Sequence, residues 1–158
     1  MYHLIVRHLA RTSFVRLGQG DYEFALKLCA DDVTHTFRGP PNAITGTRHG
    51  KARLRAWFQR VTTVFRGLHF EIKMVTSSGW PWNTVAIVEW ADRAIPADGE
   101  PYINEGVNII RMRWGKVKEI IAYNDTAAVE RTMQRLASAN VAEAGLPPIE
   151  GSDSVGSG

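Results

Sequence analysis

The stretch from Tyr102 to Asp125, YINEGVNIIRMRWGKVKEIIAYND, determines how the rest of the chain can be arranged. β-Branched residues stand on both sides of Trp114-Gly115-Lys116, which favours two strands, and Gly115 can adopt the positive φ of a tight turn. Charged side chains alternate with apolar ones in both halves, the period of a sheet with one wetter face. The stretch therefore predicts a long hairpin with its other face available to line a site.

The remaining elements follow from hydrophobic periodicity. The segment 54–65 places apolar residues at helical spacing and needs a sheet to cover, and two further strands follow it at once. The expected order is two helices, a strand, a helix, four strands and a helix, at about residues 4–17, 22–29, 33–37, 54–65, 68–77, 84–92, 102–113, 116–124 and 126–136. This order predicts an α+β fold.

The chain has 158 residues, the length of one domain, and 44% of them are hydrophobic. Cys29 is the only cysteine, so no internal disulfide is possible, and its setting predicts a buried thiol in a reducing, cytoplasmic compartment. The first apolar run is broken by Arg7, His8 and Arg11, so we expect neither a signal peptide nor a membrane-spanning helix. No membrane partner is predicted.

Basic residues gather where the third helix is expected, and the chain has a net charge of +3. No aromatic interleaving or nucleic-acid motif accompanies them, so the sequence predicts a solvated helix face and no nucleic-acid partner. The residues concerned are Arg48, Lys51, Arg53, Arg55, Arg60 and Arg66.

The C-terminal segment differs in composition from the rest. Residues 140–158 hold no Lys or Arg, show no periodicity after Ala144 and end in small polar residues. We therefore predict a domain over residues 1–139 and a tail over 140–158 that is mobile beyond about Ile149.

Three segments resemble a known superfamily. They are GDYEFALKLCADDVTHTF (20–37), ITGTRHGKARLRAWF (44–58) and GKVKEIIAYNDTAAV (115–129). Together with the order of elements, they resemble the nuclear transport factor 2-like superfamily, and within it the SnoaL-like and ketosteroid-isomerase-like branch. The resemblance covers residues 1–139.

The resemblance implies a cone-shaped α+β fold in which a curved antiparallel sheet wraps around an apolar pocket and a long helix closes it. It also implies a homodimer formed through the convex face of the sheet. Members of the superfamily include isomerases, polyketide cyclases, dehydratases, epoxide hydrolases and non-catalytic binding proteins, so the fold does not fix the function.

The chain holds more aromatic residues than a small core needs. A pocket for a hydrophobic ligand would use several of them, whereas plain core packing explains them equally well. The candidate ligand-binding residues are Phe37, Trp57, Phe58 and Trp90, with Trp80 and Trp82 in a hairpin turn as further aromatics.

Asp92 is the best acid–base candidate, because strand alternation sets Val88, Trp90 and Asp92 on one face and an apolar pocket raises a carboxyl pKa toward neutrality. The alternative is a solvated acid at the end of a strand. Compared with the limonene-epoxide-hydrolase pattern, Trp90 replaces an arginine and Ala122 a second acid, so epoxide opening is not expected.

His35 shares a strand face with Val33 and Phe37. By the resemblance, the catalytic aspartate of ketosteroid isomerases falls at Phe37, which argues against that mechanism. A neutral His35 facing a pocket could exchange protons together with Asp92, and the alternative is a hydrogen-bonded core histidine.

Amide and phenol groups of the last two strands are candidates to hydrogen-bond a ligand oxygen. Asn108 and Asn104 share one face, and Tyr123 lies on the opposite alternation from Asn124. A polar rim of the sheet is the alternative, particularly for Asn104. Asp125 is expected to cap the last helix.

The histidines are not spaced as paired metal ligands, and glycine motifs for phosphates or dinucleotides are absent, so no metal or cofactor is implied. The sequence leaves two hypotheses. One is a cofactor-independent isomerase, cyclase or lyase acting by acid–base catalysis on a small hydrophobic carbonyl or polyketide-like compound. The other is a non-catalytic module that binds a small molecule or a partner.

Overall fold

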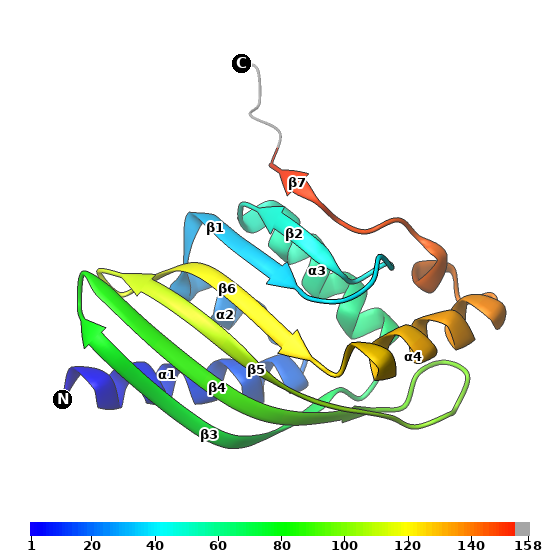
Figure 1. Ribbon diagram of the computed structural model, residues 1–158, viewed down its shortest axis with the longest axis horizontal. Helices are drawn as coiled ribbons and strands as arrows, with labels where there is room; N and C mark the ends of the chain where they lie inside the picture. Colours follow the sequence, from blue (N-terminus) through cyan, green and yellow to red (C-terminus); the bar gives the residue numbers. More distant parts are fainter. Residues whose placement is uncertain (154–158) are drawn as a thin grey trace.

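The computed structural model describes residues 1–153 (Figure 1). The helices are α1 (Tyr2–Gly18), α2 (Glu23–Leu28), α3 (Lys51–Val64), α4 (Thr126–Ser138) and the 3-10 helix η1 (Ala142–Gly145). The strands are β1 (Cys29–Phe37), β2 (Gly46–His49), β3 (His69–Trp80), β4 (Asn83–Ala94), β5 (Tyr102–Arg113), β6 (Lys116–Asn124) and β7 (Gly151–Ser152). They form an α+β fold around one curved, unclosed sheet, which confirms the predicted fold class.

The sheet has the strand order β3-β4-β5-β6-β1-β2-β7. Strands β3 to β6 form an antiparallel meander, which contains the two hairpins that the sequence predicted. However, β1 pairs in parallel with β6, and β2 with β7, so the sheet is mixed rather than wholly antiparallel. Parallel neighbours join segments that are distant along the chain, and local patterns therefore gave no sign of them.

The turn of the β5–β6 hairpin has the conformation that its sequence favours. Trp114 and Gly115 have φ values of 50° and 75°, and two consecutive positive φ values suit a two-residue hairpin turn. The Trp114 amide also donates to the Pro81 carbonyl at 2.7 Å, within the turn of the β3–β4 hairpin. The two long hairpins are thus joined at their turns.

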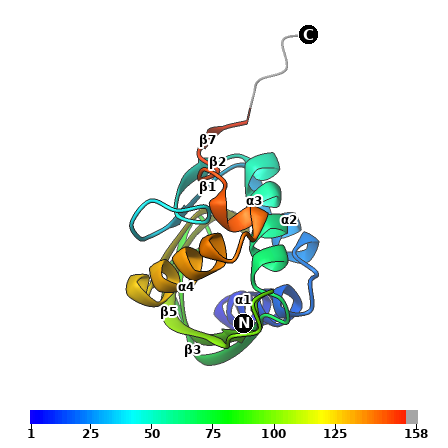
Figure 2. The same ribbon diagram turned by 90° about the vertical axis from the view of Figure 1, so that its right-hand side faces the viewer.

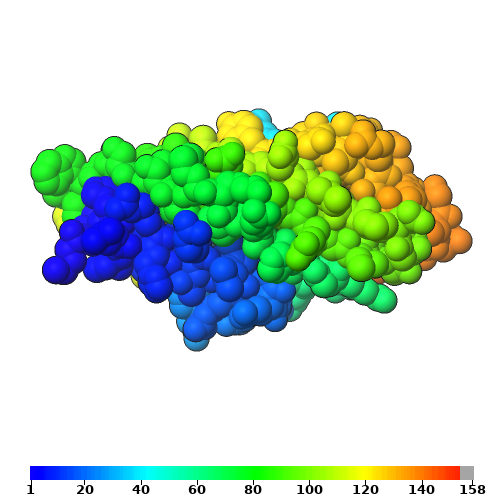
Figure 3. Space-filling model, turned by 90° about the horizontal axis from the view of Figure 1, so that it is seen from below, coloured from blue at the N-terminus to red at the C-terminus, as the bar shows by residue number. Residues whose placement is uncertain are grey.

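Three helices, α1, α2 and α3, cover one face of the sheet (Figure 2). Helix α1 lies along β3, as the space-filling view shows (Figure 3). Helix α3 directs its apolar stripe toward the sheet, as predicted, and the buried members of the stripe are Leu54, Trp57, Phe58, Val61 and Val64. This arrangement places the core between the helices and the inner face of the sheet.

Helix α4 lies at one end of the long axis of the molecule (Figure 1). It begins after Asp125, whose carboxylate accepts hydrogen bonds from the amides of Ala127 and Ala128 at 3.1 and 3.2 Å. These bonds satisfy amides that have no partner inside the helix, so the predicted cap is confirmed.

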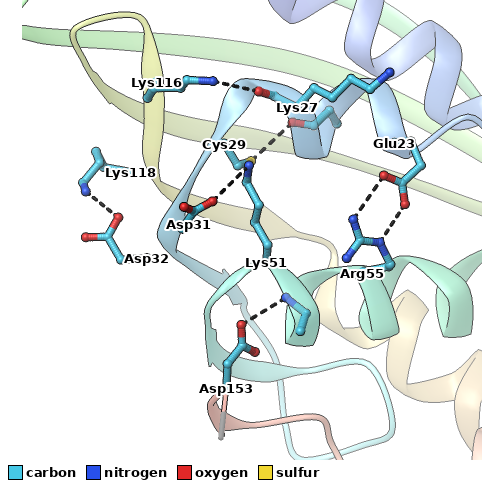
Figure 4. Close-up of polar contacts among 12 residues, drawn as sticks. Glu23, Lys27, Cys29, Asp31, Asp32, Lys51, Arg55, Lys116, Lys118 and Asp153 are labelled. Atoms are coloured by element: carbon cyan, nitrogen blue, oxygen red, sulfur yellow. Dashed lines mark hydrogen bonds and ion pairs between the residues drawn. The ribbon is translucent and has the colours of Figure 1, made fainter. Parts of the chain in front are cut away.

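Residues 142–153 pack against the rest of the domain, which the sequence did not reveal. Strand β7 pairs with β2, and the Asp153 carboxylate accepts from the amides of Ala52 and Arg53 at 3.1 and 2.9 Å (Figure 4). Gly50 precedes α3 and has no side chain to cap it, so Asp153 serves as the cap from a distant segment. The domain boundary at residue 139 and the mobility expected beyond about Ile149 stay predictions, and residues 154–158 of that tail lie outside the described residues.

Cys29 is buried, as predicted. Burial raises the pKa of its thiol to about 11, so the group stays protonated and poorly nucleophilic at neutral pH. Within residues 1–153, no helix has the length and apolar character needed to cross a membrane.

Candidate functional site

An apolar cavity of about 130 Å³ lies between the helices and the inner face of the sheet. Its volume is close to the ~150 Å³ of an engineered apolar cavity that holds a benzene molecule. Side chains from α1, α2, α3 and strands β1 and β3–β6 form its walls. Its few side chains with hydroxyl, thiol, imidazole, carboxyl or amide groups are Ser13, Cys29, His35, Asp92, Tyr102 and Asn108.

The aromatic candidates form much of the cavity wall. Phe37, Trp57, Phe58 and Trp90 all line it, and the Trp57 ring lies 5.5 Å from that of Phe37 and 5.4 Å from that of Phe58. The Trp57 indole N–H donates to the Ile44 carbonyl at 2.7 Å, which fixes the orientation of the ring. A ligand contact for these four residues stays a prediction.

Trp80 and Trp82 lie outside the cavity. They stack on each other at the β3–β4 turn with ring centroids 5.5 Å apart, and their side chains are exposed. They are therefore not part of the cavity wall.

Asp92 points from β4 into the cavity. Val88, Trp90 and Asp92 are all buried, as strand alternation predicted. The Oδ1 atom of Asp92 has no hydrogen-bond partner within residues 1–153, and no Lys or Arg there forms an ion pair with the carboxyl. Burial raises the carboxyl pKa to about 7, against a weaker opposing effect of the Asn104 backbone. The alternative of a solvated acid at a strand end is therefore wrong.

His35 lies on β1 and lines the same cavity. Its Nδ1 atom is 2.5 Å from Nη1 of Arg48. Because a guanidinium group only donates, Nδ1 must accept this hydrogen bond, and the neutral ring then carries its proton on Nε2. Burial, followed by the charge of Arg48, holds the pKa of His35 well below its ordinary value of 6.5. The ring is therefore uncharged at neutral pH.

Arg48 is a buried residue of the site that the sequence analysis assigned to a solvated helix face. That assignment is wrong, because Arg48 belongs to β2 and its side chain is 0% exposed. Besides His35, it donates to the carbonyls of Ile149 (2.9 Å), Thr45 (3.1 Å) and Gly46 (2.9 Å). Burial lowers its pKa to about 10, so it remains a cation at neutral pH.

No local signal identified Arg48. Its acceptors are mainly backbone carbonyls, and one of them lies 101 residues further along the chain. Its guanidinium also lies 5.2 Å from the centroid of the Trp57 ring, which helps to accommodate the buried charge.

Of the three predicted groups on the last two strands, only Asn108 lines the cavity. Its Oδ1 accepts from the Trp90 indole N–H at 2.9 Å. Asn104 is buried, but its side chain donates to the Tyr102 hydroxyl and accepts from the amides of Glu105 and Asp125. It holds the β5–α4 region together and is absent from the cavity wall.

Tyr123 faces away from the cavity, because it alternates with the buried Ala122 on β6. Its side chain is 44% exposed, and the guanidinium of Arg38 lies 5.6 Å from its ring centroid. The structure therefore does not bring Tyr123 together with His35, Asp92 and Asn108.

No group of three or more His, Cys, Asp or Glu side chains suited to holding a metal ion occurs in the part of the chain that the structure describes. His35 and Asp92 come from different elements, and no hydrogen bond between described residues joins them. A ligand would thus lie between a carboxyl group on one wall and an imidazole on another.

Comparison with known proteins gives the chain a family. The family model of the SnoaL-like domain matches residues 10–120. No curated protein matches the chain.

Several solved structures share the fold at low sequence identity. PrhC from Penicillium brasilianum NBRC 6234 is 20% identical, with a TM-score of 0.72 over 87% of this chain and 91% of that protein. An LEH-like epoxide hydrolase from M. tuberculosis is 13% identical, with a TM-score of 0.65 over 89% of this chain and 98% of its own. A putative SnoaL-like polyketide cyclase from Jannaschia sp. CCS1 is 14% identical, with a TM-score of 0.60 over 79% and 88% of the two chains.

The family match spans most of the domain, and the similar structures have the same fold. The chain belongs to the SnoaL-like family of the nuclear transport factor 2-like (NTF2-like) superfamily.

Proposed function

We propose that the protein transfers protons, without a cofactor, on a small hydrophobic carbonyl or polyketide-like compound, and so isomerises, cyclises or cleaves it. The observation that carries the proposal is the Asp92 carboxyl, which is buried in an apolar cavity with one oxygen unpaired and a pKa of about 7. A group with this pKa can both take and return a proton at neutral pH.

In the proposed reaction, the Asp92 carboxylate removes a proton from the carbon next to the ligand carbonyl, and the C–H electron pair forms an enolate. The carboxylic acid then returns the proton at the same or another carbon. The apolar wall keeps water away from this intermediate, and the Asn108 amide is available to donate to its oxygen, because its Oδ1 is already bonded to Trp90.

Membership of the SnoaL-like family supports a small-molecule ligand but does not select a reaction. The solved structures, at 13–20% identity, establish a shared fold only. Trp90 and Ala122 line the cavity at the positions where the epoxide-hydrolase pattern has an arginine and an acid. We therefore favour enolisation over epoxide opening.

Hydrogen–deuterium exchange tests this proposal. The protein is incubated in D₂O with single-ring carbonyl compounds that suit the cavity, namely cyclohexanone, cyclohex-2-enone and acetophenone, and deuterium incorporation next to the carbonyl is followed by NMR. We expect exchange faster than in buffer, increasing with pH through about 7 as Asp92 ionises.

The matched variants are Asp92→Asn and Glu89→Gln, because Glu89 lies on the same strand but is exposed on the opposite face. Asp92→Asn should reduce the exchange rate by about 10²–10⁴-fold, whereas Glu89→Gln should leave it unchanged. Equal rates in wild type and Asp92→Asn would exclude Asp92 as the base.

The second candidate function is a non-catalytic binding module. Trp90 and Ala122 favour this function, because they line the cavity where the epoxide-hydrolase pattern has catalytic residues. A family member that has lost its catalytic residues can keep the cavity and still bind a ligand. Binding of these ketones without any enzyme-dependent exchange would support this function.

A homodimer through the convex sheet face, which the family resemblance implies, is also a proposal. Ile87, Ile109 and Ile121 form one row across β4, β5 and β6 on the outer face, and all three are only partly buried in the single chain. Sedimentation analysis of Ile109→Glu tests this surface. A cytoplasmic location, expected from the single buried Cys29, likewise stays a prediction.

A further inference from the structure

Building on the proposed function, we infer that Arg48 and His35 together form an oxyanion-binding group. In this group the Nε2–H of His35 donates to the ligand oxygen, and Arg48 is a positioning residue that also supplies positive charge behind the ring. The ligand class is then a compound whose oxygen carries or gains negative charge, such as an enolate or a phenolate.

The hydrogen bond to Arg48 sets the tautomer of His35. Nδ1 accepts from the guanidinium at 2.5 Å, so the ring proton must be on Nε2. Nε2 makes no hydrogen bond to residues 1–153, and the ring lines the cavity. His35 therefore offers a donor to the ligand and cannot serve as a base through Nδ1.

The positive charge of Arg48, next to the His35 ring, is not neutralised by an ion pair within the described residues. The residues around His35 and Arg48 are mostly uncharged. Trp57 contacts His35 from α3 at a centroid distance of 4.4 Å, and Ile120 is its register partner on β6. Glu150 and Arg60 act on Arg48 in opposite directions, and Glu150 is exposed, where solvent weakens its effect. The net result favours negative charge on an oxygen bound at Nε2.

The C-terminal segment holds Arg48 in place. The Ile149 carbonyl accepts from its Nε at 2.9 Å, and β7 follows directly, pairing Gly151 with Arg48 itself. Asp153 then fixes the end of the segment to α3. Residues 149–153 are thus part of the support of the oxyanion-binding group.

The first test is a ¹⁵N NMR measurement of the His35 ring in the wild-type protein, without any ligand. We expect the Nε2–H tautomer at neutral pH and no titration near 6.5, because burial and the charge of Arg48 lower the pKa of the ring. An Nδ1–H tautomer, or a titration near the ordinary histidine value, would overturn the inference, whether or not the protein is an enzyme. The conservative variant Arg48→Lys keeps the charge and should retain part of the wild-type signal, whereas Arg48→Met should give a mixture of tautomers.

The second test compares binding of 4-fluorophenol and fluorobenzene by ¹⁹F NMR, since the two probes differ only in the oxygen. We expect wild type to prefer the phenol by about two- to tenfold, because a hydrogen bond between neutral groups contributes about 0.5–1.5 kcal/mol. His35→Phe should abolish the preference, and Glu89→Gln, on the exposed face of β4, should keep it. An equal affinity for both probes in wild type would overturn the inference.

The two tests separate this inference from the proposed function. If the ketone exchange described above fails while the tautomer and the phenol preference are found, the oxyanion-binding group stands and the catalytic proposal falls. If exchange depends on Asp92 but His35→Phe does not change the phenol preference, the reverse holds.

Discussion

Two strands of the cavity wall, β4 and β1, each bury one ionisable side chain, and the two groups behave differently. On β4, Asp92 is 9% exposed and forms no ion pair with any residue of the described range 1–153. On β1, His35 is 3% exposed and accepts a hydrogen bond from a buried cation, Arg48. The carboxyl has its pKa raised to about 7, whereas the imidazole pKa is held well below its ordinary range.

Burial favours the neutral form of both groups, and the neighbouring residues decide whether each group can still gain or lose a proton near neutral pH. Asp92 can still change its charge there, because nothing else fixes its protonation state. His35 cannot, because Arg48 opposes a second positive charge and occupies Nδ1. The difference assigns proton transfer to one wall and hydrogen-bond donation to the other.

The largest expected effect follows from removing the cation. Arg48→Met leaves His35 Nδ1 and three backbone carbonyls without their donor, and each buried unpaired group costs about 1–3 kcal/mol. We expect the free energy of unfolding, measured with urea, to fall by about 3–5 kcal/mol.

Arg55→Met is the matched control, because Arg55 lies on α3 and pairs with Glu23 at the surface (Figure 4). Its loss should cost at most about 1 kcal/mol. Similar losses in both variants would mean that the buried hydrogen bonds of Arg48 contribute little.

The next largest effect concerns Asp92 and has a defined pH dependence. The carboxyl pKa is about 7 in the folded protein and 3.8 as its ordinary value, a difference that corresponds to about 4 kcal/mol at most. Below about pH 3 the carboxyl is protonated in both states and costs nothing. As the pH increases to 7, the unfolded chain ionises first and the folded state loses stability.

Asp92→Asn removes this cost. The variant should therefore match wild type in urea unfolding at about pH 3 and exceed it by about 2–4 kcal/mol at pH 8. A variant that is less stable than wild type at pH 8 would show that the carboxylate is well solvated or paired in the folded protein.

A smaller effect is expected at the support of Arg48. Asp153→Ala removes the cap of α3, and a lost cap costs about 0.5–2 kcal/mol. Asp31→Ala is the control, because Asp31 pairs with Lys51 at 3.4 Å near the same helix end while its side chain is fully exposed. Thermal unfolding should show a clear decrease in melting temperature for Asp153→Ala only. An equal decrease for both variants would mean that Asp153 acts on α3 through surface charge and not as a cap.

The smallest effect is expected on the outer face. Tyr123→Phe removes a hydroxyl from an exposed side chain that lies outside the cavity. Binding of 4-fluorophenol should stay within about twofold of wild type, since no cavity contact is lost. A tenfold weaker affinity would indicate that this face contacts the ligand after all.

The sequence was sufficient to predict those parts of the structure that follow from local patterns. The alternation of the 102–125 stretch and its Trp114-Gly115 turn gave the hairpin, and the alternation of Val88, Trp90 and Asp92 gave the inward position of the carboxyl. Asp125 was identified as a helix cap in the same way. These features depend on neighbours within a few residues, which a single sequence displays.

The sequence was not sufficient where contacts are long-range. Strands β2 and β7 are four and two residues long and pair across about 100 residues. Arg48 carries no sequence pattern that separates it from the partly exposed arginines of α3. The alternation correctly placed Asn104 on a buried face of β5. Its side chain, however, is hydrogen-bonded to the Tyr102 hydroxyl and to the Asp125 amide at the start of α4, so it does not line the cavity.

The most direct test of the account is the titration of Asp92 itself. The protein is labelled with ¹³C at the aspartate side-chain carboxyl, and the Asp92 resonance, assigned by its absence in Asp92→Asn, is followed from pH 3 to pH 9. The account predicts a midpoint near 7. A midpoint near the ordinary value of 3.8 would contradict it, because the carboxyl would then be solvated or paired, and it would be a weaker base than the apolar site implies.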